Sequence, residues 1–144
     1  MNVFEELRAG KPYHILDPDY VEQVHGEMKR CRHLCWKIGQ TDPDEREEIV
    51  RLEEELLGPL KGGTFLTPPF QVDLGCRLFL GENVFANHGL TVMSVGTITI
   101  DDGYEMAGSL QGFDALGIGL AHFLDRPVII ELVGKITVKQ QKLV

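Results

Sequence analysis

The chain has 144 residues, enough for one domain or one domain with a small appendage, and its 43% hydrophobic and 25% charged content is typical of globular proteins. The net charge of −8, without a basic stripe, argues against nucleic acid as a partner. No apolar run reaches the roughly 18 residues of a membrane-spanning helix, and the charged N-terminus does not resemble a signal peptide, so we expect a cytoplasmic protein without membrane contact.

The first sixty residues carry the periodicity of helices. Residues 3–9 predict a short amphipathic helix. Asp17 and Pro18 then form a start signal, an N-cap followed by proline at the first helical position. Apolar residues follow at steps of three and four as far as Ile38, and Gly39 is predicted to end this helix.

A second start signal leads into an acidic helix. Asp42 is predicted to be the N-cap, with Glu45 three positions on as in a capping box, and Gly58 is predicted to end the helix. Its acidic residues are expected to form a solvated face. Two such helices make an αα-hairpin too small to be stable alone, so residues 1–60 should pack on the remainder of the chain.

Three cysteines are present, and an odd number without a secretion signal indicates free thiols. Cys31 and Cys35 are four residues apart and share a helix face, whereas His33 would point elsewhere. A metal site is one interpretation of this group. With no fourth ligand nearby, we favour two small buried side chains and expect no metal.

Residues 66–107 carry a repeat of an apolar residue, Gly or Asp, two turn formers and another apolar residue. Leu80–Val84 is one such unit and Ile100–Tyr104 is a second. This pattern is typical of a hexapeptide-repeat parallel β-helix, in which short strands send aliphatic side chains inward. Further strands are predicted at Val128–Ile130 and Ile136–Val138. The predicted fold class is therefore mainly β, with a helical hairpin at residues 1–60 followed by a β-helix at residues 61–144.

The order of these parts resembles the maltose and galactoside O-acetyltransferase family. Leu7–Tyr13 looks like the start of that family's helical domain, Pro68–Gly75 like its entry into the β-helix, and Leu80–Asn87 like the coil after that entry. The resemblance implies a left-handed β-helix, a homotrimer, acetyl-CoA as co-substrate and transfer of an acetyl group to a sugar hydroxyl. The family has further coils that hold acetyl-CoA, which implies that the β-helix of this chain is truncated.

The resemblance also implies a set of site residues. His122, in a segment similar to the family's histidine segment, is the candidate general base. The alternative is that His122 is a loop histidine without a catalytic role. Imidazole suits the role because its pKa lies near neutrality. Asn87 matches an asparagine that lines the acceptor site, although an asparagine there also suits a tight turn. Tyr13 and Asp17 lie where the helical domain contributes, and the N-cap role would by itself explain Asp17.

Two further features bear on the site and its activity. His88 is a further candidate in the site, and is also a plausible turn residue. Ser94 and Val95 stand where the family commonly has an acidic pair. The expected absence of the coils that hold acetyl-CoA favours the alternative to an enzyme, a catalytically inactive β-helix that binds sugar or serves as an oligomeric scaffold.

Overall fold

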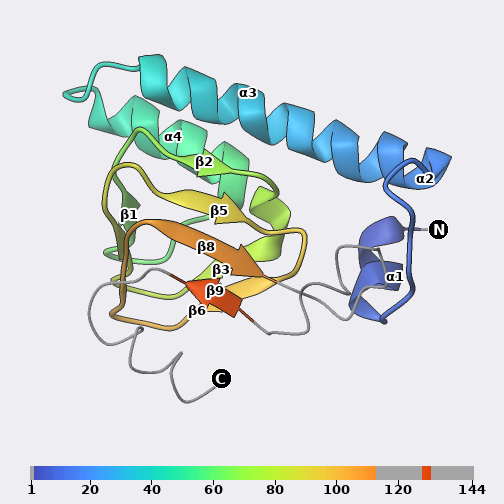
Figure 1. The fold of residues 1–144 in the computed structure, drawn as a ribbon. Helices are drawn as coiled ribbons and strands as arrows, with labels where there is room; N and C mark the ends of the chain where they lie inside the picture. Colours follow the sequence, from blue (N-terminus) through green and yellow to red (C-terminus); the bar gives the residue numbers. More distant parts are fainter. Residues whose placement is uncertain (1, 113–127, 131–144) are drawn as a thin grey trace.

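The computed structural model describes residues 2–112 and 128–130, a stack of short parallel strands with helices across one end (Figure 1). The chain opens with α1, Val3–Arg8, whose N-cap Asn2 accepts a hydrogen bond from the Phe4 amide at 2.9 Å. It continues through α2, Pro18–Tyr20, a π-helical turn at Val21–His25 and α3, Gly26–Gln40. No helix in the described ranges is long and apolar enough to cross a membrane.

Two predicted helix boundaries are wrong. Gly39 does not end α3, because Gln40 is still helical and Thr41 is the C-cap. The predicted capping box does not form: α4, Arg46–Leu57, begins after Glu45, whose side chain makes no cap bond. Asp42 instead accepts a hydrogen bond from the Asp44 amide at 2.9 Å, the local turn that short acidic side chains favour. Gly58 ends α4 with a φ of 84°, as predicted.

The strands wind into three sheets, parallel except at β9, that form the faces of a coil. The first sheet contains β1 (Phe65–Leu66), β4 (Phe85–Ala86) and β7 (Glu105–Met106). The second contains β2 (Gln71–Val72), β5 (Thr91–Met93), β8 (Ser109–Gly112) and β9 (Val128–Ile130). The third contains β3 (Leu78–Leu80) and β6 (Ile98–Ile100), joined to β2 by a 3-10 turn at Gly75–Arg77. The parallel coil confirms the predicted repeat architecture, and its left hand stays a prediction.

The register shows how the repeat works. Leu80 pairs with Ile100, so the two repeat units identified in the sequence stack directly on each other. Phe85 pairs with Phe65 on one side and with Glu105 on the other, a spacing of 20 residues per coil. Three hexapeptides would give a spacing of 18, and the spacing falls to 18 at Thr91 and Ser109. The difference arises at one corner: residues 87–90 connect β4 to β5, whereas only residues 107 and 108 connect β7 to β8.

Aliphatic side chains from all three sheets fill the coil and join the helical hairpin in one hydrophobic core. The coil contributes the fully buried Leu66, Val72, Val84 and Val92, and the helices contribute Ile38, Ile49, Leu52 and Leu56. The prediction that the hairpin packs on the repeat region is confirmed. A second cluster joins α1, α2 and the π-helical turn to the coil through Val3, Leu7, Tyr20, Val24 and Leu74.

The cysteine pair has a structural role at the first coil. This coil has no strand above it, so its backbone N–H groups face the helices (Figure 1). Cys35 Sγ accepts a hydrogen bond from the Val72 amide and Cys31 Sγ accepts one from the Gly75 amide, both at 3.4 Å. Burial raises the pKa of Cys31 to about 11, so this thiol stays protonated. The two thiols cover an otherwise open sheet edge.

The described strands end differently from the way they begin. β9 runs antiparallel to β8, with Leu110 opposite Ile130 and Gly112 opposite Val128. The strand predicted at Val128–Ile130 is therefore confirmed, but it does not continue the parallel stacking of the coils. Ile136–Val138 lies outside the described residues.

Candidate functional site

Asn87 and His88 lie at an exposed corner of the coil between β4 and β5. The Asn87 amide donates to Met106 O at 2.8 Å, which holds this corner to the next coil. Asn87 Oδ1 accepts a hydrogen bond from the His88 amide at 2.9 Å, and Gly89 completes the turn with a φ of 80°. Asn87 therefore has the role in a tight turn that its sequence position suggested. The side-chain amide of Asn87 is at the exposed surface, where its NH₂ group can donate to a ligand.

An aromatic column beside Asn87 was not anticipated from the sequence. Phe85 lies two residues before Asn87, so both side chains project from the outer face of β4. Phe85 is 40% exposed and pairs in register with Phe65, over whose ring the Arg46 guanidinium lies at 3.6 Å. The signal was available in the alternation of Phe85, Ala86 and Asn87, with only Ala86 buried. Aromatic faces beside an amide suit the apolar faces and hydroxyls of a sugar ring.

Tyr13 and Asp17 belong to a separate module around α1 and α2. The Tyr13 hydroxyl donates to Glu6 Oε2, and Lys11 lies 2.9 Å from Glu6 Oε1. Asp17 is the N-cap residue of α2 by position, yet its side chain does not cap that helix. Asp17 Oδ2 instead accepts a hydrogen bond from the His14 amide at 2.9 Å. The half-buried Asp17 thus keeps a second carboxylate oxygen for another partner.

A buried arginine fixes this module to the coil. Arg77 is 1% exposed, donates from Nη1 to Phe4 O at 3.3 Å and lies 5.8 Å from the Phe4 ring. Burial lowers the pKa of Arg77 and also raises the pKa of Tyr20. Arg77 therefore links the helical module to the coil.

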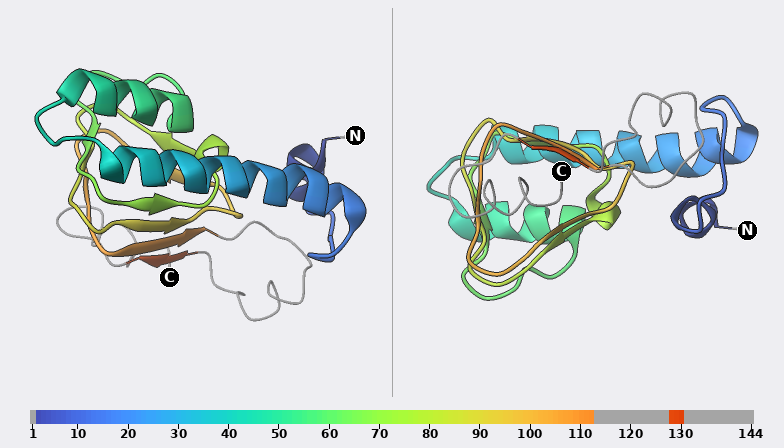
Figure 2. Two further views of the ribbon diagram at one scale, coloured as in Figure 1. Left: turned by 90° about the horizontal axis from the view of Figure 1, so that it is seen from above. Right: turned by 60° about the horizontal axis from the view of Figure 1, so that its bottom comes forward.

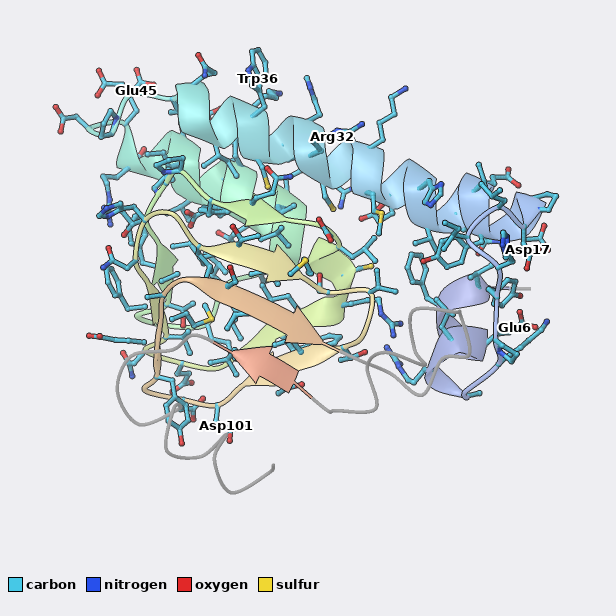
Figure 3. All side chains as sticks on the ribbon, viewed as in Figure 1. Glu6, Asp17, Arg32, Trp36, Glu45 and Asp101 are labelled. Atoms are coloured by element: carbon cyan, nitrogen blue, oxygen red, sulfur yellow. The ribbon has the colours of Figure 1, made fainter. Side chains whose placement is uncertain are left out.

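The two groups of predicted site residues are not brought together within one chain. Asp17 lies at the far end of α3, beyond the coils (Figure 3). Asn87 follows β4, in the sheet with β1 at the opposite end of the molecule (Figure 1). His122, the predicted general base, lies outside the described residues. Within residues 2–112 and 128–130, no group of three or more His, Cys, Asp or Glu side chains could hold a metal ion.

Ser94 and Val95 replace the expected acidic pair with structural residues. Ser94 is fully buried, where its Oγ donates to Leu74 O at 2.8 Å and accepts from the Leu74 amide at 3.2 Å. Val95 packs against the cluster that holds α1. This corner of the coil therefore carries no acid at either position.

The two hydrogen bonds between Ser94 and Leu74 predict a stability effect. Ser94→Ala leaves the buried Leu74 amide and carbonyl without their partner, so we expect a loss of about 1–3 kcal/mol in the free energy of unfolding. Urea denaturation measures this loss. Thr99→Ala, at an exposed position on β6, is the control and should change stability by less than about 0.5 kcal/mol. Equal effects of the two substitutions would contradict the assigned role.

Comparison with known proteins supports the resemblance seen in the sequence. Residues 7–62 match the family model of the maltose acetyltransferase hexapeptide capping motif. The galactoside O-acetyltransferase of Escherichia coli K12 is 28% identical over 107 residues, which cover 74% of this chain and 51% of the relative. Nodulation protein L of Rhizobium leguminosarum bv. viciae is 27% identical over 111 residues, which cover 77% of this chain and 56% of the relative. The chain thus spans about half the length of the curated relatives it matches.

A solved structure has the same fold. It is a hexapeptide-repeat acetyltransferase of Vibrio cholerae, crystallised with acetyl coenzyme A, with a TM-score of 0.63 and 18% sequence identity. The match covers 91% of this chain and 69% of that protein. Capping motif, coil and relatives together support the similarity of the chain to the maltose/galactoside O-acetyltransferase family.

Proposed function

We propose that this protein transfers an acetyl group from acetyl-CoA to a sugar hydroxyl, in a homotrimer whose acceptor site is shared between neighbouring subunits. The observation that carries the proposal is the separation of two groups of predicted site residues, here called half-sites: the corner at Asn87 and the helical module with Asp17. Asn87 and Asp17 lie at opposite ends of one chain, so one acceptor site can contain both only if they come from different subunits (Figures 1 and 3). A cyclic assembly repeats that contact in every subunit and closes on itself.

Each half-site has chemistry suited to an acceptor sugar. The corner at Asn87 offers an amide donor, the imidazole of His88 and the exposed ring of Phe85. The helical module offers the free carboxylate oxygen of Asp17, while Tyr13 is already bonded to Glu6 and positions the loop between α1 and α2. Amide and carboxylate together bind hydroxyl groups as donor and acceptor.

The reaction requires a base and a proton path. His122 removes the proton of the sugar hydroxyl, whose oxygen attacks the thioester carbonyl of acetyl-CoA. The carbon–sulfur bond then breaks, and the proton passes from the imidazole to the departing CoA sulfur. The product is an acetylated sugar and free CoA.

The direct test measures CoA release from acetyl-CoA with a panel of glycosides and maltose. We expect release by the wild-type chain and a loss of at least about 100-fold in His122→Ala, the usual scale for removal of a general base. Thr99→Ala, on the outer face of β6, should keep wild-type activity. Release that does not depend on His122 would contradict its assignment.

The shared site has a sharper test in mixed assemblies. Asn87→Asp keeps the Oδ1 acceptor for the His88 amide, and Asp17→Asn keeps an acceptor for the His14 amide, so both variants should fold. Each variant alone should be inactive. Co-expressed at equal levels, they should regain roughly a quarter of wild-type activity, because random mixing gives that share of interfaces with both native residues. Absence of any gain over the separate variants would refute a site shared between subunits.

A catalytically inactive sugar-binding or scaffold protein is the second candidate. It is favoured by the antiparallel β9, which interrupts the parallel coils, and by Ser94 and Val95 in place of acids. In that case calorimetry should detect glycoside binding that Asn87→Asp weakens, with no CoA release.

A further inference from the structure

The outer face of α3 combines basic side chains with an exposed aromatic ring. Lys29, Arg32, His33 and Trp36 are spaced at helical steps of three and four, so they share one side of the helix. Trp36 is 61% exposed and stacks on His33 with the ring centroids 5.8 Å apart. Figure 3 shows Trp36 and Arg32 pointing away from the coils. We call this set, with Lys37, the basic face.

The basic face makes no salt bridge within the described part of the chain. Arg30, on the flank of α3, is paired with Glu27 at 2.7 Å. The structure records no ion pair of Lys29, Arg32 or Lys37 with any described residue. The chain as a whole has a net charge of −8, so the positive charge around the exposed Trp36 has the opposite sign to the rest of the protein.

The neighbouring helix presents the opposite charge. The outer side of α4 exposes Glu47, Glu54 and Glu55, and a shallow hollow along it is lined by Arg46, Glu47, Val50, Arg51 and Glu54. Arg51 is held in place by Glu48 at 2.7 Å and Glu55 at 3.4 Å. The loop before α4 adds Asp42, Asp44 and Glu45. We call this surface the acidic face.

The helices α3 and α4, which carry the two faces, lie side by side across the end of the coil stack (Figure 2). The helices are antiparallel neighbours, and Arg30 Nη1 donates to Glu55 O at 3.2 Å. The hydrogen bond from Arg51, with a smaller contribution from Lys37 across the helix pair, lowers the pKa of Glu48. The charged lengths of the two faces therefore match. A surface that is basic on one half and acidic on the other is complementary to itself.

We propose that the α3–α4 hairpin is a two-fold docking surface for a second copy of this chain. The two-fold axis lies above the outer surface of the hairpin, parallel to the helices and over the line midway between them. A rotation about this axis sets α3 of each copy on α4 of the other. Positions along the helices are unchanged by that rotation. Trp36 of one copy then faces the hollow at Val50 and Arg51 of the other, and Arg32 faces Glu54.

The size of the surface sets the expected strength. At 1.5 Å per residue α3 and α4 are roughly 20 Å long, and two helices side by side are about 20 Å wide, which gives a footprint of about 400 Å² per copy. Stable interfaces bury about 800 Å² per partner, so a single contact should be weak, with a Kd of about 10⁻⁴ M, and sensitive to salt. If the chain is a trimer, several contacts between two trimers would act together.

The experiment uses the tryptophan as its own probe, because Trp36 is the only one in the chain. Sedimentation and fluorescence are measured up to about 0.5 mM protein, several times the expected Kd. We expect the mass of the basic assembly unit to double, with a blue shift of the Trp36 emission, and both changes to reverse in 0.5 M salt, where screening extends over only about 4 Å.

Charge exchange makes the test specific. Lys29→Glu with Arg32→Glu makes both faces acidic, and Glu47→Lys with Glu54→Lys makes both basic. Neither double variant should associate alone, but an equal mixture of the two should form pairs. Lys61→Glu, a charge reversal at an exposed position outside both faces, should associate as the wild type does. Association that survives in the first double variant, or no association of wild type at any concentration, would overturn the proposal; neither result bears on acetyl transfer.

Discussion

Replacing Glu53 by glutamine should stabilise the protein by about 3–5 kcal/mol at pH 9 and leave its stability nearly unchanged at pH 4. Glu53 is fully buried on the inner side of α4, and its carboxyl oxygens make no hydrogen bond of normal geometry with a described residue. Burial raises its pKa to about 8, while the nearby Leu66 amide and Arg46 act in the opposite direction. Denaturation in urea at a series of pH values measures the difference between the two proteins.

The sign of this effect is set by proton binding. Below the ordinary glutamate pKa of about 4.3, the carboxyl is protonated in both folded and unfolded chains, so it makes no pH-dependent contribution. Between about 4.3 and 8 the unfolded chain loses this proton and the folded chain keeps it, so stability falls as the pH rises. The glutamine side chain of the variant cannot ionise, and the variant escapes this loss.

An exposed carboxyl on the same helix provides the control. Glu47→Gln removes an acid from the outer side of α4 and should change stability by less than about 0.5 kcal/mol at both pH values. A constant difference between wild type and Glu53→Gln from pH 4 to pH 9 would show that the carboxyl is not buried as described.

The coil was predictable because its signal is local. Leu80–Val84 and Ile100–Tyr104 are similar stretches 20 residues apart, and the structure pairs Leu80 with Ile100. The helix ends were less predictable, because tertiary contacts compete with local signals. Glycine is the residue type that most often ends a helix, yet α3 continues past Gly39 to Gln40. Gly39 lies near Pro69 at this point.

The site was harder to predict for a physical reason. In the proposed site Asp17 and Asn87 act together, but one chain holds them apart: Asp17 lies at the far end of α3 (Figure 3), and Asn87 follows β4. The polar contacts between the helices and the open edge of the first coil could not be predicted from the sequence either. Cys31, Cys35 and Glu53 occupy apolar positions of their helices, and only the open edge of the first coil explains why polar atoms lie there.

The glycine at the entry to the third face of the coil should be the least replaceable small residue of the described part. A Cβ on Gly75 would overlap Leu56 O and lie 2.9 Å from Leu56 C, both backbone atoms of α4. Gly75 also donates its amide to Cys31 Sγ on α3, so neither helix can move without breaking a contact. We expect Gly75→Ala to lower the free energy of unfolding by about 3 kcal/mol or more, measured by urea denaturation.

The matched substitution is Gly26→Ala at the start of α3. Gly26 is exposed, has helical φ and ψ of −61° and −46°, and has no atom within 4 Å of the added Cβ. The same chemical change should therefore stabilise the chain by about 0.4–1 kcal/mol, because alanine loses less entropy than glycine on folding. Opposite signs at the two glycines are expected only if the hairpin lies directly on the first coil, since a detached hairpin would make Gly75→Ala as harmless as Gly26→Ala.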